Sequence, residues 1–247
     1  MKTMQDIVKK AQLSGPQKLV VAVANDDHVI EAVEMARKER IIDPILVGDE
    51  KLILAVLDHL KISKTPYEII NVEDPIKACE EAVKLVSSGK ADLLMKGLVD
   101  TAVILRAVLD KDFGLRTPNR LSHVSIMEIP TYHKLLMMSD GAMNTYPDVD
   151  IKQEIIENGV EILRKIGVKH PKVGCICAIE KINPKMQHTL DCQELIERNQ
   201  NERIKNCTIG GPFALDNAIN KEAALHKGVK DPMAGEVDFV LMPQIES

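Results

Sequence analysis

The chain has 247 residues, of which 45% are hydrophobic, and its 32 Lys+Arg against 37 Asp+Glu give a net charge of −5. A chain of this length buries roughly 70–75% of its unfolded surface, so a stable core needs neither disulfides nor a structural metal. The acidic balance, with three Phe, three Tyr and no Trp, argues against a nucleic-acid partner, which requires clustered cations and stacking rings. No apolar run approaches the ~18 residues of a membrane span, and the start lacks the apolar core of a signal peptide. We therefore expect a cytoplasmic protein without a membrane partner.

The cysteines are odd in number and lie mostly in apolar stretches, which is typical of reduced thiols in a cytoplasmic core. They are Cys79, Cys175, Cys177, Cys192 and Cys207. Cys175 and Cys177 would share one face of a strand, so a metal or redox pair is the alternative. Because no neighbouring residues complete a four-ligand set, the core interpretation is favoured and no metal site is predicted.

Short apolar runs alternate with helical stretches through the first half of the chain. The predicted strands cover residues 19–24, 44–47, 67–72 and 91–95, and the predicted helices begin near 25–27, at 49, at 75 and at 100. Strands that are apolar throughout must be covered on both faces. This half is therefore predicted to be a parallel sheet between two layers of helices.

After residues 116–119 the pattern changes, because two strand-like runs at 123–129 and 134–138 follow without a helix between them. A long amphipathic helix at 148–166 comes next. The strands at 172–179, 207–209 and 237–242 then alternate with helices at 189–199 and 215–227. We predict a first α/β domain over residues 1–120 and a second over 121–247.

A candidate anion site lies where the fourth predicted strand ends. Lys96 and Gly97 fall at its carboxyl end, and Thr101 lies near the first turn of the next helix, where free backbone N–H groups favour an anion. Arg106 follows in the same helix, and a guanidinium can bind phosphate or carboxylate through two hydrogen bonds. The alternative is a solvated Lys96, a simple turn at Gly97 and an Arg106–Asp110 pair at helical spacing. Spacing alone does not decide between them.

Two further segments carry polar residues after predicted strands. Asn183 and Lys185 lie in a strand-to-helix connection and could contact a polar substrate while Thr189 caps the helix, although residue types alone favour a solvated loop. Residues 210–212, Gly-Gly-Pro, follow a strand and open a helix that carries Asp216. They would allow close approach of a ligand or simply form a turn.

Several common motifs are missing from the sequence. No Gly-x-Gly-x-x-Gly fingerprint, Walker-type lysine loop, His-Glu-x-x-His pair or Gly-x-Ser-x-Gly elbow is present. These absences disfavour a dinucleotide-binding domain, a P-loop NTPase, a zinc protease and a serine hydrolase of the α/β class.

Ordered blocks along nearly the whole chain resemble a known family. They include DPILVGDE from Asp43, LLMKGLVDTAVILRAVLDKDFGLR from Leu93, INPKMQHTLD from Ile182, GGPFALDNAINKEAALHKG from Gly210 and AGEVDFVLMPQIE from Ala234. The sequence resembles the phosphate acetyltransferase and phosphate butyryltransferase family, most closely its butyryl branch. The resemblance implies two doubly wound α/β domains with mainly parallel sheets and an interdomain cleft, a fold shared with isocitrate and isopropylmalate dehydrogenases, and a homodimer.

The implied activity is reversible transfer of a short-chain acyl group, butyryl or similar, between coenzyme A and inorganic phosphate. Coenzyme A is then a substrate, and no tightly bound cofactor is implied. Arg106 matches an arginine that the family uses to bind the phosphate of the acyl phosphate, and Thr101 matches a hydroxyl residue near the substrate. The resemblance extends the substrate site to Lys96, Gly97 and Arg116 in the same motif, and to Asn183, Lys185 and Asp216 on an opposing wall.

The sequence departs from the family pattern at its end. The family continues its last strand as Pro-Asp-Ile-Glu-x-Gly-Asn and later carries a Ser-Arg-Asp group that assists the reaction, whereas this chain ends PQIES, with Gln244 in place of the Asp. We therefore assign no catalytic residue and expect a C-terminally truncated transferase of doubtful activity. One alternative is a non-catalytic remnant that binds coenzyme A or phosphate. Another is a metal- and NAD-dependent decarboxylating dehydrogenase of the same fold, which the lack of clustered aspartates disfavours.

Overall fold

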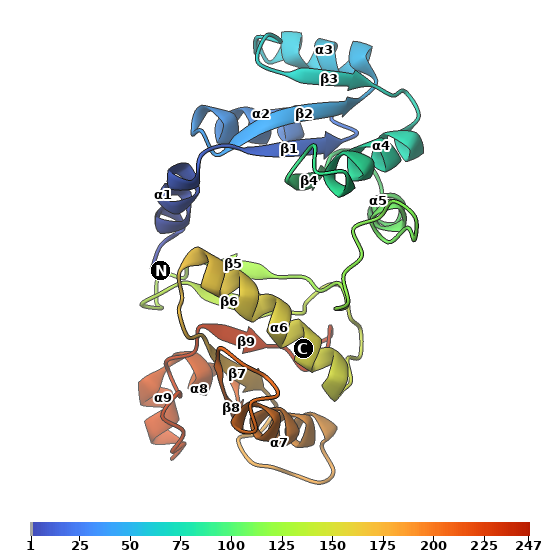
Figure 1. The fold of residues 1–247 in the computed structure, drawn as a ribbon. Helices are drawn as coiled ribbons and strands as arrows, with labels where there is room; N and C mark the ends of the chain where they lie inside the picture. Colours follow the sequence, from blue (N-terminus) through green and yellow to red (C-terminus); the bar gives the residue numbers. More distant parts are fainter. Residues whose placement is uncertain (1) are drawn as a thin grey trace. The chain divides into compact units, whose positions relative to one another are not determined.

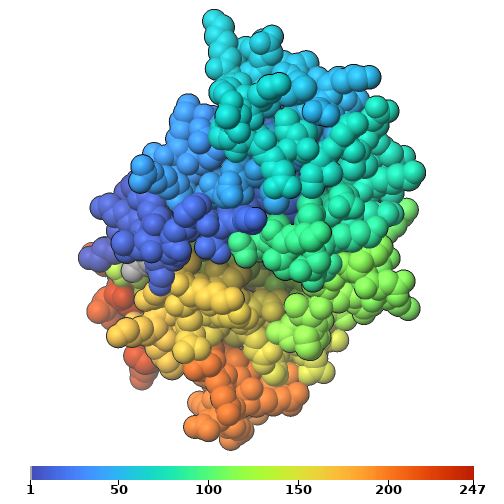
Figure 2. Space-filling view, turned by 45° about the horizontal axis from the view of Figure 1, so that its top comes forward, coloured from blue at the N-terminus to red at the C-terminus, as the bar shows by residue number. Residues whose placement is uncertain are grey.

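The computed structural model describes residues 2–247 and divides the chain into two compact units. One unit comprises Val8–Thr117, and the other comprises Pro118–Ser247 with the N-terminal residues up to Ile7. Each unit has its own sheet (Figure 1). Figure 2 shows one face of the molecule with its side chains drawn, in the colours of Figure 1.

The Val8–Thr117 unit contains a four-stranded sheet in the order β3-β2-β1-β4, with every neighbouring pair parallel. Its elements, preceded by α1 (Met4–Ser14), are β1 (Gln17–Ala22), α2 (Asp27–Lys38), β2 (Ile42–Gly48), α3 (Glu50–His59), β3 (Glu68–Asn71), α4 (Pro75–Ser87), β4 (Leu93–Lys96) and α5 (Thr101–Val108). The predicted parallel sheet is confirmed. The helix α1 was not predicted, because it buries no residue and so has no buried apolar face.

Both faces of this sheet are covered. Val20 and Ala22 of β1 belong to a core that also contains residues of α4 and α5, while Leu19 and Val21 belong to a second core with residues of α2 and α3. This division follows from the alternation of side chains along a strand. The sheet is therefore doubly wound, as the sequence predicted.

Aspartates define the starts of the helices in this unit. Asp26 accepts a hydrogen bond from Val29 N at 3.0 Å, Asp49 caps α3 in the same way, and Asp74 caps α4 directly before Pro75. Each carboxylate satisfies backbone donors that have no partner inside the helix. The predicted helix starts at 49 and 75 thus agree with the structure to within one residue.

The second unit has a five-stranded sheet in the order β5-β6-β9-β7-β8, in which β5 is antiparallel to β6 and the other pairs are parallel. Its elements are β5 (Ser125–Met127), β6 (Leu136–Ser139), α6 (Val149–Ile166), β7 (Lys172–Ile176), α7 (Gln187–Gln200), β8 (Thr208–Phe213), α8 (Leu215–Ile219), α9 (Lys221–His226) and β9 (Phe239–Leu241). The last strand, β9, lies between β6 and β7. The sheet is mainly parallel, in agreement with the predicted fold class.

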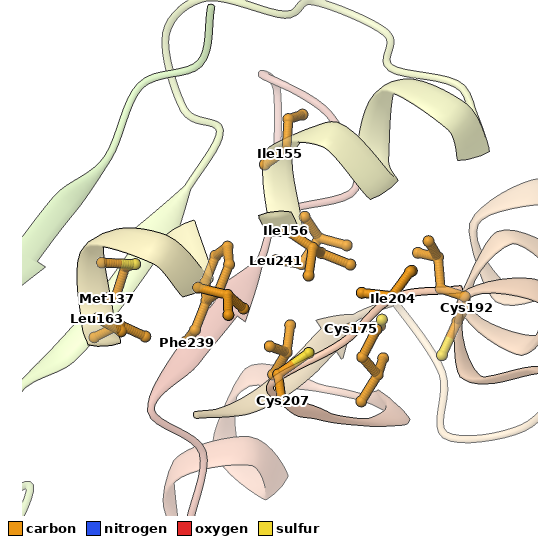
Figure 3. Close-up of a cluster of buried hydrophobic side chains, with 14 of the residues drawn as sticks. Met137, Ile155, Ile156, Leu163, Cys175, Cys192, Ile204, Cys207, Phe239 and Leu241 are labelled. Atoms are coloured by element: carbon orange, nitrogen blue, oxygen red, sulfur yellow. The ribbon is translucent and has the colours of Figure 1, made fainter. Parts of the chain in front are cut away.

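The core of this unit lies between α6, α7 and the sheet. Figure 3 shows Ile155, Ile156 and Leu163 of α6 in the same cluster as Phe239 of β9. The approach of helix to strand is close at Gly159, because a Cβ built there would lie 2.6 Å from Phe239 Cε1. A separate core on the other face contains residues of α8 and α9.

Several predicted boundaries in this unit differ from the structure: β7 ends at Ile176 and not at 179, and two larger differences lie in the segment from 207 to 227. The strand β8 extends through Phe213, so the segment Gly210-Gly211-Pro212 is part of the strand and not a loop after it. Burial explains the extension, since Pro212 and Phe213 both lie in the interior. The predicted helix at 215–227 is divided into α8 and α9 at Asn220, whose side chain accepts a hydrogen bond from Ala223 N at 3.0 Å and so starts a new helix.

All five cysteines are free and buried. Within residues 2–247, no group of three or more His, Cys, Asp or Glu side chains could hold a metal ion. None of the helices over these residues has the length and apolar character needed to cross a membrane.

Candidate functional site

The first candidate site lies at the carboxyl end of β1 and β4. From β1 the chain moves outward through β2 and β3 and then returns to place β4 on the other side of β1. The last residues of the two strands, Ala22 and Lys96, are paired in register. Open α/β sheets bind ligands at this kind of switch point, beyond the carboxyl ends of the strands.

The turn after β4 is built from close backbone contacts. Gly97 N donates to Ala22 O at 2.8 Å, and a Cβ at Gly97 would lie 2.1 Å from Val23 O. The side chain of Lys96 is folded over this turn, where its Nζ donates to Val99 O at 2.9 Å and to Gly97 O at 3.3 Å. Gly97 is therefore required for packing, and Lys96 is exposed but hydrogen-bonded to the backbone.

The helix α5 begins directly after this turn. Thr101 is its first residue and is exposed, and Asp100 at the N-cap makes no side-chain hydrogen bond to the helix. Among the described residues, the backbone amides of Thr101 and Ala102 have no hydrogen-bond acceptor. Free backbone amides at a helix N-terminus favour an anion, and the anion site at this helix end stays a prediction.

Arg106 lies in a groove between α4 and α5 whose apolar lining includes Ile76, Val103 and Phe113. The carboxylates of Glu80 and Asp110 also line this groove.

Both carboxylates have partners other than Arg106. Glu80 pairs with Lys84 at 3.7 Å, and Asp110 Oδ1 accepts from the backbone amides of Asp112 and Phe113. Arg106 itself has no ion pair within residues 2–247, so the alternative Arg106–Asp110 pair does not form. The guanidinium therefore shares the groove with an apolar lining and two carboxylates that are bonded to other partners.

The five predicted residues of this unit do not converge on one point. Lys96, Gly97 and Thr101 surround the turn after β4, whereas Arg106 lies five positions beyond Thr101, which corresponds to a rotation of about 140° around the helix. Arg116 is exposed in the loop after α5 and has no ion pair among the described residues. The structure thus brings three of the five together.

The predicted residues Asn183, Lys185 and Asp216 belong to the other unit. Asn183 Oδ1 accepts from Lys185 N at 3.0 Å and closes the connection before α7. The predicted cap at Thr189 is wrong, because α7 begins at Gln187 with Met186 at its N-cap. Thr189 is instead buried, where its Oγ1 accepts from Asn183 N at 2.9 Å and donates to Met186 O at 2.8 Å.

Asp216 forms an exposed ion pair. Lys227 Nζ lies 3.0 Å from Asp216 Oδ2 and 3.2 Å from Glu180 Oε1, and the hydrogen bond from Lys227 lowers the pKa of Asp216. Asn217 donates to Glu180 Oε1 at 2.7 Å, and its own buried Oδ1 has no hydrogen-bond partner among the described residues. Lys227 was not predicted as a site residue, because it lies 11 residues from Asp216 and 47 from Glu180 in the chain and no local spacing links the three.

A buried charged cluster near the carboxyl end of β7 was not predicted from the sequence. Lys152 of α6 is 2% exposed, and its Nζ lies 2.6 Å from Asp191 Oδ2 and 3.2 Å from His188 Nδ1. A signal was present, because Lys152 shares a helix face with Ile155 and Ile156 at the three- and four-residue spacing of an apolar stripe. A lysine on such a stripe must be paired when buried.

Comparison with known proteins matches nearly the whole chain to one family. Residues 2–81 and 76–247 match the family described as phosphate acetyl/butaryl transferase. The chain is 45% identical over 246 residues to a phosphate butyryltransferase of Clostridium acetobutylicum, covering 100% of this chain and 82% of that protein. It is 41% identical over 244 residues to a phosphate acetyltransferase of Thermotoga maritima, covering 99% and 82% of the two chains.

A solved structure supports the same relationship. The branched-chain phosphotransacylase of Enterococcus faecalis V583 superimposes with a TM-score of 0.81 at 28% identity, over 93% of this chain and 80% of that one. Sequence and fold therefore agree across both units. The chain belongs to the phosphate acetyl/butyryl transferase family.

Proposed function

We propose that this protein transfers a short-chain acyl group, with butyryl preferred, reversibly between coenzyme A and inorganic phosphate. The observation that carries the proposal is the 45% identity to a phosphate butyryltransferase, which extends over the full chain. The 41% identity to a phosphate acetyltransferase makes acetyl the competing acyl group.

In this reaction the coenzyme A thiolate attacks the carbonyl carbon of an acyl phosphate, a C–S bond forms, the C–O bond to phosphate breaks and phosphate leaves. The step requires cations for the phosphoryl oxygens and a donor for the developing oxyanion. We assign phosphate binding to Arg106, because its guanidinium is exposed in its groove and makes no ion pair within residues 2–247. The free amides of Thr101 and Ala102 are the second anion-binding group in the same unit. No base is assigned.

The assay that tests the proposal follows release of coenzyme A from butyryl-CoA with inorganic phosphate, detected with a thiol reagent. Turnover, with a higher kcat/KM for butyryl-CoA than for acetyl-CoA, would support the proposal. Saturable coenzyme A binding without turnover would instead indicate the non-catalytic binding protein. A preference for acetyl-CoA would retain the reaction but overturn the butyryl assignment.

Variants of Arg106 test the phosphate site. Arg106→Ala should raise the KM for phosphate about 10- to 100-fold, because a charge-assisted hydrogen bond of about 1.5–3 kcal/mol is lost. The KM of Arg106→Lys for phosphate should lie between those of the parent and of Arg106→Ala, since lysine keeps the charge but loses the bidentate geometry. Arg164→Ala, at an exposed arginine of α6, is the control. An unchanged KM in Arg106→Ala would remove Arg106 from the site.

A further inference from the structure

The buried Lys152–Asp191 pair has no spare negative charge for a second cation. The side chains of Lys152 and Asp191 are 3% and 7% exposed, and Lys152 Nζ lies 2.6 Å from Asp191 Oδ2. The other carboxylate oxygen, Oδ1, accepts from Gln187 Nε2 at 2.8 Å. The two charges of the pair cancel. A further positive charge beside them would be buried without compensation, which costs free energy.

His188 lies beside this pair as a neutral ring. Lys152 Nζ is 3.2 Å from His188 Nδ1, and an ammonium group offers only donors, so Nδ1 is the acceptor and carries no proton. His188 is also the second residue of α7, where the partial positive charge of a helix N-terminus disfavours a cation. Burial, and then the charge of Lys152, lower the pKa of His188. A proton added to this ring therefore meets an ammonium group and a helix end of the same sign.

His188 lines a small cavity at the carboxyl ends of β7 and β9, with room for about one water molecule. From the β9 side the cavity is lined by Leu241 and Pro243, which carry no charge. Cys175 of β7 and Cys192 of α7, which are 3% and 1% exposed, also line it. Figure 3 shows both cysteines in the core cluster of this unit. Two buried thiols are thus close to the ring and can report whether the cavity opens.

The titratable groups around the ring come from α6, from α7 and from β7 with the residue that follows it. They are Lys152, Asp191, Cys192, Cys175 and Cys177, whose Sγ donates to His188 O at 3.4 Å. The one carboxylate among them, Asp191, is already matched by Lys152. Because His188 is only half-buried, a protonated ring can turn toward water and leave the Lys152–Asp191 pair in place. That response avoids the cost of an uncompensated buried charge.

We propose that His188 is an acid-sensitive latch: its neutral ring closes the cavity between β7, β9 and α7, and protonation drives the ring away from Lys152 and opens the cavity to solvent. The closed ring binds a proton more weakly than an open one, so the closed form is favoured above the ordinary histidine pKa of ~6.5 and loses population below it. The latch adjoins the connection that carries the predicted substrate residues Asn183 and Lys185. It does not depend on acyl transfer, so its tests use no turnover.

The first test measures how fast individual cysteines of the full chain react with a dithiodipyridine, a reagent that labels thiols in weak acid, with the labelled positions identified by peptide mass spectrometry. Cys207 is the reference, because it belongs to the same core cluster but is not among the residues that line the cavity. Labelling of Cys175 and Cys192 relative to Cys207 should become about five- to tenfold faster between about pH 7.5 and about pH 5.5. The factor follows because one pH unit below its pKa an open ring is about tenfold more protonated than free.

His188→Gln is the matched variant, since its amide carries no charge at either pH and its oxygen can still accept from Lys152. The labelling ratio of this variant should not change with pH. An equal rise in His188→Gln, or a constant ratio in the parent chain, would overturn the proposal. Cys79 of the other unit monitors unfolding, and a rise there as large as at Cys175 would mean that acid unfolds the chain generally and that no latch exists.

The second test needs no variant. Nitrogen-15 NMR of the parent chain with labelled histidine, assigned through the backbone, reports the protonation of each ring. We expect His188 to have an unprotonated Nδ1 and to titrate below ~6.5. His28, whose side chain is 93% exposed, is the internal reference. A proton on Nδ1 in the neutral ring, or a titration at or above that of His28, would overturn the proposal whatever the thiols do.

Discussion

Glu34 on α2 is 7% exposed, and its carboxylate is held by a dense set of donors. It accepts from Arg37 at 2.7 and 3.0 Å and from the hydroxyl of Tyr67 at 2.6 Å. These hydrogen bonds, chiefly that from Arg37, lower the pKa of Glu34 to about 2. The ionised carboxylate is thus stabilised in the folded chain relative to the unfolded one.

We predict that Glu34→Gln lowers the free energy of unfolding by about 2 kcal/mol at pH 7, the range expected for hydrogen bonds to a charged group. Because the folded pKa is depressed, this contribution is present above the unfolded value near ~4.3 and is lost as the pH falls toward 2. Urea unfolding at pH 7 and at about pH 3 measures the difference, which should shrink at the lower pH. Glu31→Gln, at an exposed site of the same helix, should change little at either pH, and a difference that grows on acidification would contradict the prediction.

Gly97 gives a second prediction at the level of one residue. Gly97→Ala places a Cβ 2.1 Å from the carbonyl oxygen of Val23, and backbone cannot yield as a side chain can. We expect the free energy of unfolding to fall by about 3 kcal/mol or more, which is at or beyond the upper end of the cost of overpacking a core. Gly141→Ala, whose Cβ would meet only the flexible end of Met138 at 3.4 Å, is the control. Thermal unfolding of the two variants should differ clearly.

At the scale of elements, the helix starts differ in what their capping residues do. Asp148 accepts from Ile151 N at 2.8 Å at the start of α6, whereas Asp100 makes no such bond at the start of α5. Asp148→Ala should therefore lower the free energy of unfolding by about 1 kcal/mol. Asp100→Ala should lower it less, because no cap hydrogen bond is lost. Urea unfolding followed by circular dichroism compares the free energies of unfolding of the two variants. Equal losses would show that Asp100 does cap α5 and that its first amides are not free.

The elements that could be predicted from the sequence are those set by local signals. The helix of α6 was predicted to within one residue, because Asp148 caps it and its isoleucines repeat at helical spacing. The position of β9 between β6 and β7 could not be predicted, since it depends on pairing between residues far apart in the chain. The same limit applies to the site. The strand end at Lys96 was predicted, but the partner of Lys152 lies 39 residues away in the chain and that of Asp216 lies beyond the break between α8 and α9, which was not predicted.

At the scale of the whole molecule, one unit is continuous in sequence. Val8–Thr117 contains a complete doubly wound sheet with a core on each face, and it is of a size that folds independently. We predict that residues 8–117 expressed alone unfold in one cooperative transition, and that Glu34→Gln shifts this transition by the same amount as in the full chain. Circular dichroism in urea is the measurement, and a gradual, non-cooperative loss of signal would show that the unit needs the rest of the chain.

The burial of all five thiols bears on how this protein is handled at the bench. Burial raises the pKa of Cys177 to about 12 and that of Cys207 to about 11, so neither supplies a reactive thiolate near neutrality. A colorimetric disulfide such as Ellman's reagent should therefore stay colourless with the native chain and record only coenzyme A as it is released. In denaturant the same reagent should titrate five equivalents per chain. The thiols that react in a sample without denaturant therefore measure the fraction of unfolded molecules.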